Sequence, residues 1–216
     1  MVNCLPPPIL TNLENIPLGG NYLVTFNHYH RPGFNAWWFA MAIAAALPLE
    51  AHLVMTNELT FPGAWYGFAG RPLSRFVLKR IAKIYGFDLM PPMPPRPSDT
   101  AQRAGAVRSL LTWLKNADDN PVIMLAPEGG DQAEGLLARP PVGVGRMMQL
   151  ISAGGLRILP AAFWEQDSSP RVSFGEVYAL EIPMAHTRDE VDRLISQQVM
   201  ERIARLLPES LRGDFR

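Results

Sequence analysis

A histidine and a glutamate-glycine turn, about a hundred residues apart, are the residues of this sequence best suited to chemistry. His28 follows an apolar stretch at residues 22–26, and a Pro-Glu-Gly-Gly turn at 127–130 follows a second one at 122–126. Histidine is the side chain best suited to take a proton from a hydroxyl near neutral pH. If both stretches are strands of one sheet, the two segments lie where ligand crevices open in α/β folds.

Neither segment is specific by itself. A lone histidine after a strand is more often structural than catalytic, and a Pro-Glu-Gly-Gly turn is more often a tight turn with a solvated carboxylate. Their combination favours a site in which His28 is a base and Glu128 stands beside it. Gly129 and Gly130 permit positive φ and a close approach of the backbone to a ligand.

Apolar stretches bounded by turn residues alternate with segments of helical period, which predicts an α/β domain with a mostly parallel sheet flanked by helices. The later apolar stretches are continuous rather than alternating, as expected when both faces of a sheet are covered. Thr187 and Glu190 form a capping box at the start of the final helix. Strands are expected at 22–26, 52–56, 122–126 and 157–164, and helices at 35–47, 72–85, 100–116, 144–153 and 188–207.

Length and composition favour one domain, 1–216, in a reducing compartment. The 216 residues suffice for one full core, and the net charge of zero gives no reason to expect a nucleic-acid partner. The single cysteine, Cys4, cannot form an internal disulfide, and no spacing resembles a zinc site. We therefore expect a cytoplasmic protein without a metal or cofactor. The longest apolar run, 36–49, includes Pro48 and is shorter than the roughly 20 residues of a membrane span.

The segment between Glu58 and Asp88 is strongly polarised, because it contains five basic residues and no acidic one. The basic positions 75, 79 and 83 line up on a helix, near aromatic residues at 61–68. Residues 61–84 would suit attachment to an anionic membrane surface, and thus a peripheral location on its inner face. An ordinary amphipathic helix over the core fits the pattern equally well. For the apolar helix at 35–47, core packing is favoured over an acyl-chain groove.

Taken together, these segments resemble the phospholipid and glycerol acyltransferase family, which acts on glycerol 3-phosphate and lysophosphatidic acid. Residues 24–28 look like the family's strand leading into Asn-His, and 125–130 look like its Phe-Pro-Glu-Gly-Thr block. Residues 145–160 resemble its glycine-led helix and following Ile-Val-Pro-Val strand, and 172–176 match its late Phe-Gly-Glu segment. The resemblance covers about residues 20–180. It implies the glycerolipid acyltransferase-like fold.

The resemblance also implies a reaction. His28 would deprotonate a hydroxyl of a lysophospholipid, glycerol phosphate or related lipid acceptor, which then attacks the thioester of acyl-CoA or acyl carrier protein. Such an acyltransferase would serve phospholipid biosynthesis without a bound cofactor. Glu128 would orient the acceptor or the site, and Gly129 and Gly130 would approach a phosphate or carbonyl oxygen. The neighbouring residues expected to bind substrate are Asn27, His30, Arg31 and Asn35.

Two departures from the family pattern leave alternatives open. Gly33 stands where the family has an aspartate that supports the histidine, and a shifted pair, His30 with Asn35, has the right spacing but no charge. The family's phosphate-binding arginine is missing after Gly86, so Arg96 or Arg103 would have to replace it. The alternative function is a non-catalytic lipid or acyl-thioester binding protein. A serine hydrolase is disfavoured because the sequence contains no Gly-x-Ser-x-Gly motif.

Overall fold

The computed structural model describes residues 6–30, 37–59, 70–93, 96–117, 120–130, 135–182 and 187–216. In these ranges the chain forms a seven-stranded sheet in the order β1-β7-β6-β2-β5-β3-β4. The central strands are parallel, whereas β7 runs antiparallel to β6 and β1 runs parallel to β7. The predicted α/β fold with a mostly parallel sheet is therefore confirmed. The strands are β1 (Ile9–Thr11), β2 (Tyr22–Phe26), β3 (His52–Thr56), β4 (Asp88–Met90), β5 (Val122–Leu125), β6 (Arg157–Gln166) and β7 (Ser169–Phe174).

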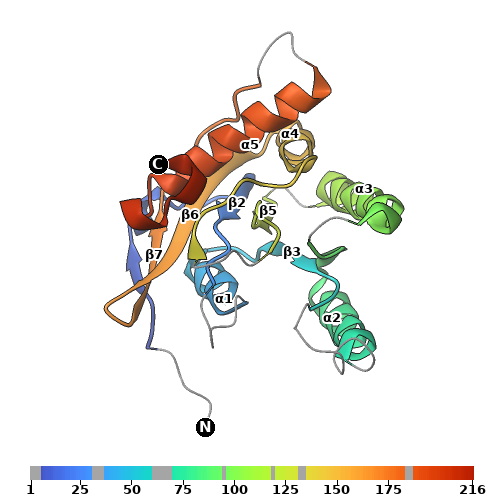
Figure 1. The fold of residues 1–216 in the computed structure, drawn as a ribbon, viewed down its shortest axis with the longest axis horizontal. Coiled ribbons are helices and arrows are strands. Elements are labelled where there is room, and N and C mark those ends of the chain that lie inside the picture. The colour runs from blue at the N-terminus through green and yellow to red at the C-terminus, as the bar shows by residue number, and fades with distance from the viewer. Residues whose placement is uncertain are drawn as a thin grey trace.

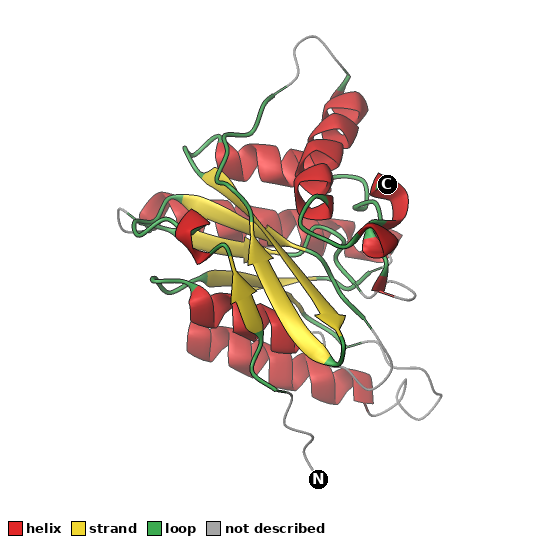
Figure 2. Ribbon diagram, turned by 90° about the vertical axis from the view of Figure 1, so that its left-hand side faces the viewer, coloured by secondary structure: helices red, strands yellow, loops and turns green. Residues whose placement is uncertain are grey.

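Helices cover both faces of the sheet, as the continuous apolar strands predicted (Figures 1 and 2). Figure 1 shows α3, α4 and α5 on one side and α1 and α2 on the other. None of the helices in the described ranges is long and apolar enough to cross a lipid bilayer. The helices are α1 (Trp37–Ala46), α2 (Arg71–Tyr85), α3 (Thr100–Asn116), α4 (Val144–Ser152) and α5 (Arg188–Ala204).

The core has two halves, one on each face of the sheet. Successive side chains of β2 point to opposite faces, so this strand contributes to both halves. Leu23 points into the half formed with α3, α4 and α5. Tyr22, Val24 and Phe26 point into the half that contains Phe39 of α1. All five residues of β2 are buried between β5 and β6. This central position makes the end of β2 a rigid place for a functional residue.

The sequence missed three strands, β1, β4 and β7, for identifiable reasons. β1 and β4 each have three residues, too few to show a period. β7 contains Pro170 and Arg171, and its turn from β6 is Asp167-Ser168. Both turn residues have positive φ, 52° and 60°, as a tight two-residue hairpin requires. The turn lacks the glycine that would normally reveal such a hairpin.

The predicted helices are found with small shifts at their ends. The capping box is present, since the Thr187 side chain accepts a hydrogen bond from the Glu190 amide. The final helix ends at Ala204 instead of residue 207, and α4 ends at Ser152. The predicted start of the first helix, at Asn35, lies outside the described residues. Local periodicity therefore located the helices, and it overran the end of the final helix by about one turn.

A glycine sets the close packing of α4 on α5 and gives a first test. A Cβ at Gly145 would lie 2.1 Å from the Asp192 carbonyl oxygen of α5, whereas one at Gly105 of α3 would meet nothing within 4 Å. We expect Gly145→Ala to lower the free energy of unfolding by about 1–3 kcal/mol through overpacking. Gly105→Ala, the matched control, should raise it by about 0.5–1 kcal/mol. Urea unfolding measures both, and equal effects would contradict this packing.

Candidate active site

The parallel pairing of β2 with β5 brings the two predicted site segments together. Thr25 lies opposite Leu125 in the register, so the chain leaves both strands at the same edge of the sheet. The Glu128 carboxyl group is buried, with 2% of the residue exposed, and its Oε2 accepts a hydrogen bond from the main-chain amide of His28 at 2.5 Å. Its Oε1 accepts one from the Ala138 amide at 2.8 Å. Glu128 therefore fixes the backbone that carries His28.

The His28 ring is held by aromatic packing. It meets the ring of Phe39 edge-on, with 5.7 Å between centroids and an angle of 84°. Phe39 is itself buried in α1 and packs against Phe26 and Phe163. Because three secondary-structure elements hold Phe39, the half-buried His28 ring rests on a rigid support. Core packing, which the sequence favours for this apolar helix, is confirmed for Phe39 and Ile43 and is wrong for the exposed Trp37, Trp38 and Met41. Phe39 is the residue through which the helix reaches the site.

Asn27 joins the end of β2 to β6. Its side-chain amide donates to the Phe163 carbonyl at 2.8 Å, and its carbonyl oxygen accepts from the Phe163 amide at 2.7 Å. A side chain that pairs in both directions with a main chain extends the strand pairing by one residue. Asn27 thus positions the residue that follows it, and its predicted contact with substrate stays a prediction.

The glycine turn has a positive φ at Gly129 but not at Gly130. Gly129 has a φ of 71°, and its amide donates to the Ala126 carbonyl at 3.1 Å. A Cβ at Gly129 would lie 2.9 Å from Cγ of Met93, and one at Gly130 would lie 3.4 Å from Cβ of Met93. The turn is therefore packed against the segment that follows β4. In this conformation the Gly129 amide serves the turn, and the proposed contacts of both glycines with substrate stay predictions.

Burial sets the protonation of Glu128. Removal from water raises the pKa of this carboxyl from 4.5 to about 8, while the hydrogen bonds from the His28 and Ala138 amides act in the opposite direction. The group is therefore mostly protonated at neutral pH. A strongly raised pKa of a buried carboxyl group is typical of a functional site, although structural carboxyl groups show it too.

The third group at this edge of the sheet is an arginine cluster that the sequence reading found only in part. Glu58, 1% exposed, follows β3, which is parallel to β5. Its carboxylate pairs with Arg71 at 3.0 Å, with Arg75 at 2.5 Å and with Arg96 at 3.4 Å. Burial opposes ionisation of Glu58, yet the hydrogen bond and charge of Arg75, aided by Arg96 and Arg71, leave its pKa below the usual 4.5.

The predicted candidates Arg96 and Arg103 have different partners. Arg96 belongs to the Glu58 cluster, whereas Arg103 donates to the main-chain carbonyl of Pro92 at 2.5 Å and holds the segment after β4. The sequence pattern places Arg71 and Arg75 in the polarised segment and gives neither of them a role at the site. One feature of the sequence could have indicated this cluster. Glu58 is followed by a long segment that contains basic residues and no further acidic residue before Asp88.

The remaining candidates surround the loop after β2. His30 is half-buried, and Gly135 packs against its carbonyl, where a Cβ would lie 2.9 Å away. Arg31, Gly33 and Asn35 lie outside the described residues, so the alternative pair of His30 with Asn35 stays a prediction. The substrate contacts predicted for His30 and Arg31 also stay predictions.

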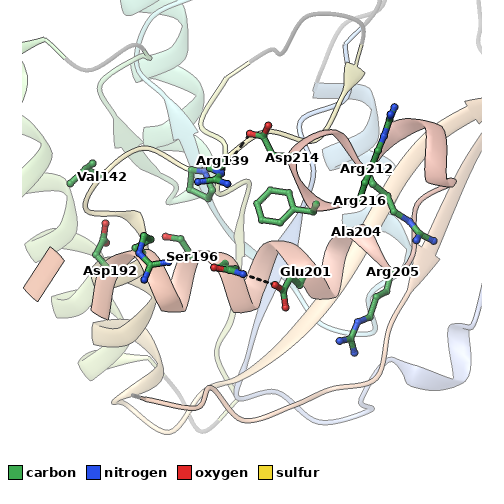
Figure 3. A pocket seen from close by; sticks show the side chains of 14 residues that line it. Arg139, Val142, Asp192, Ser196, Glu201, Ala204, Arg205, Arg212, Asp214 and Arg216 are labelled. Carbon is green, nitrogen blue, oxygen red and sulfur yellow. Dashed lines mark hydrogen bonds and ion pairs between the residues drawn. The ribbon is translucent and has the colours of Figure 1, made fainter. Parts of the chain in front are cut away.

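A cavity of about 440 Å³ lies elsewhere, between α5 and the C-terminal segment (Figure 3). Its wall includes Arg139, Glu201 and Arg212, and none of its lining residues belongs to the candidate site. Arg139 approaches Asp214 at 3.9 Å across it. Arg139, which lines the cavity, directly follows Ala138, the residue whose amide binds Glu128.

Comparison with solved structures supports the architecture. The chain resembles the crystal structure of the 1-acyl-sn-glycerophosphate (LPA) acyltransferase PlsC from Thermotoga maritima, with a TM-score of 0.55. The two proteins share a fold. The match covers 92% of this chain and 71% of PlsC at 14% sequence identity, which shows the fold alone. No family model matches the sequence, and no curated protein sequence matches it significantly.

The raised pKa of Glu128 predicts a dependence of stability on pH. The folded pKa of about 8 lies above the ordinary value of 4.5, so the folded state binds the proton more tightly. The free energy of unfolding should therefore fall as pH rises from about 4.5 to about 8, by at most about 1.4 kcal/mol per pH unit, and then level off. Glu128→Gln removes this contribution.

Urea unfolding of the wild type and of Glu128→Gln at several pH values between about 5 and about 9 measures the effect. Glutamine also turns an N–H₂ group toward a main-chain donor, so the variant should be less stable at low pH. Parallel pH profiles of the two proteins would show that Glu128 does not titrate in this range.

Proposed function

We propose that this chain is an O-acyltransferase that moves a fatty acyl group from an acyl thioester to a hydroxyl of a lysophospholipid, glycerol phosphate or related lipid acceptor. The donor would be acyl-CoA or acyl carrier protein. The observation that carries the proposal is the buried Glu128 carboxyl group, which binds the main-chain amide of His28 across the β2–β5 edge. The fold shared with PlsC supports the same reaction class.

In this reaction His28 takes the proton of the acceptor hydroxyl as the oxygen attacks the thioester carbonyl carbon. The new C–O bond gives a tetrahedral oxyanion, which collapses as the C–S bond breaks. His28 then returns the proton to the thiolate, so an ester and a free thiol leave the site. The protein forms no covalent bond, and its main contribution is a base whose position is fixed before the substrates bind.

A neutral His28 needs no charged partner to accept a proton, but the imidazolium that forms needs stabilisation. The Glu128 carboxyl contacts the main chain of His28, and its ionised form, which predominates only above about pH 8, would favour the imidazolium. We propose that this buried group partly replaces the aspartate whose position Gly33 occupies. Catalysis by such a site should be slower than with a carboxylate on the ring.

We propose that the Glu58 cluster binds the anionic group of the acceptor. Three guanidinium groups surround one carboxylate, which leaves an excess of positive charge at the carboxyl edge of the sheet. The arginine side chains are between 34% and 59% exposed, so an incoming phosphate can reach them. Glu58 holds the guanidinium groups in place, and arginine forks match the geometry of phosphate oxygens.

The base is tested by His28→Ala and His30→Ala, two substitutions in the same loop. With acyl-CoA and a panel of lysophospholipids, His28→Ala should lower kcat about 10³-fold or more, because the proton acceptor is lost. His30→Ala should leave kcat largely unchanged, and the predicted contact of His30 with substrate would show as a higher KM. Mass spectrometry of the lipid products measures turnover, and thermal unfolding checks that both variants are folded.

Each other outcome has a definite meaning. Unchanged turnover in His28→Ala overturns the assignment of the base, and a loss confined to His30→Ala assigns it to His30. A wild type that binds acyl-CoA but yields no ester, with every acceptor tried, is a non-catalytic binding protein. That alternative derives from Gly33, which removes the usual support for the histidine.

The anion site is tested by Arg75→Gln. We expect KM for a phosphate-bearing acceptor to rise about ten-fold with little change in kcat, because one charged hydrogen-bond donor is lost. KM for a neutral acceptor such as a monoacylglycerol should not change. Arg108→Gln, which changes an exposed arginine on α3, is the matched control and should alter neither value. An equal rise with both acceptors would exclude recognition of the phosphate by Arg75.

A further inference from the structure

Helix α2 turns most of its large apolar side chains outward. Only Ser74, Leu78 and Ala82 of this helix are buried, which leaves it attached to the domain along one narrow stripe. Four large apolar residues elsewhere on the helix are between 43% and 69% exposed, namely Leu73, Phe76, Val77 and Ile84. The helix therefore differs from the ordinary amphipathic helix that covers a core. Large apolar side chains exposed together on one helix typically mark an interaction site.

The exposed apolar residues share the helix with exposed basic residues. Lys79, Arg80 and Lys83 are exposed, and no acidic residue occurs between Glu58 and Asp88. At 100° per residue, Lys79 and Lys83 form a row beside Phe76, and Arg80 falls between Phe76 and Ile84. Exposed apolar side chains interspersed with lysine and arginine are the pattern of a helix that lies in the interface of an anionic bilayer.

A second exposed apolar group lies on the same side of the sheet, at the start of α1 (Figures 1 and 2). Trp37 and Trp38 are exposed and stacked, with 4.4 Å between ring centroids, and Met41 is exposed beside them. Tryptophan is enriched where proteins meet the interfacial region of membranes. The next residue, Phe39, contacts the ring of His28, so this group lies close to the candidate base.

We propose that α2 and the first turn of α1 form a docking surface for an anionic lipid bilayer. The apolar side chains would enter the acyl boundary while Lys79, Arg80 and Lys83 bind lipid phosphates. A second copy of this chain is a poorer occupant, because a symmetric contact would place these basic residues against their own copies. The docking itself does not depend on the proposed function. The further idea that docking delivers a lipid acceptor to His28 does rest on it.

Vesicle co-sedimentation of the full chain tests the surface without any use of activity. The wild type should bind phosphatidylcholine vesicles that contain phosphatidylglycerol, and should bind pure phosphatidylcholine vesicles much more weakly. Lys79→Glu combined with Lys83→Glu should weaken binding to the anionic vesicles about twenty-fold or more, from about five-fold per lysine. Phe76→Ser combined with Val77→Ser should also weaken binding to the anionic vesicles, because two apolar side chains that enter the bilayer are lost. A higher salt concentration should not restore this binding.

Matched controls come from the opposite face of the sheet. Arg108→Glu with Lys115→Glu makes the same charge change on exposed positions of α3, and Val142→Ser with Leu150→Ser removes two exposed apolar side chains near α4. Both controls should bind like the wild type. The α2 variants should also keep wild-type turnover of a short-chain, water-soluble acceptor.

The proposal is overturned if the α2 variants bind anionic vesicles as well as the wild type does, or if the controls lose binding equally. It is also overturned if the chain is a dimer without lipid and Phe76→Ser with Val77→Ser makes it monomeric, since the surface would then be an interface between copies. Failure of the acyltransferase assay leaves vesicle binding as an independent readout, so the two proposals fail separately.

Discussion

The candidate site depends on one buried carboxyl group and the two main-chain amides that it bridges. Glu128 receives hydrogen bonds from His28, at the end of β2, and from Ala138, in the segment that leads to α4. A buried carboxyl that lost either donor would bear the full cost of desolvation. The two loops are therefore held in one arrangement, and the histidine cannot move without disturbing a group that burial already disfavours in its charged form.

The architecture and the location of the site could be predicted from local pattern, because strong periods and the ends of buried strands are readable in a sequence. β2, β3 and α3 were predicted within their observed bounds, and His28 and Glu128 were expected at the edge where they lie. The nature of their contact could not be predicted. Residue types can suggest a pair of side chains. A carboxyl group that binds a backbone amide cannot be predicted in this way, because every residue except proline carries that amide.

The Glu58 cluster illustrates a second limit. Arg71 and Arg75 lie one turn apart on α2, and Arg96 comes from a different loop, so only the tertiary fold shows that all three share one carboxylate. The basic residues of α2, which form one group in the sequence, have different surroundings in the structure. Arg75 faces a buried acid, whereas Lys79 and Lys83 on the next turns face solvent. Spacing on a helix predicts the direction of a side chain but not the residue from another element that it contacts.

The packing of the C-terminal segment extends the influence of this arrangement along the chain. The Leu137 amide donates to the Leu211 carbonyl, and the Leu137 carbonyl accepts from the Asp214 amide. A Cβ at Gly213 would lie 2.0 Å from that same Leu137 oxygen, so the two backbones are in direct contact. Leu137 precedes the residue that binds Glu128. The last turns of the chain thus hold the segment whose next residue binds Glu128, so substitutions at residues 211–214 should disturb the site through the backbone.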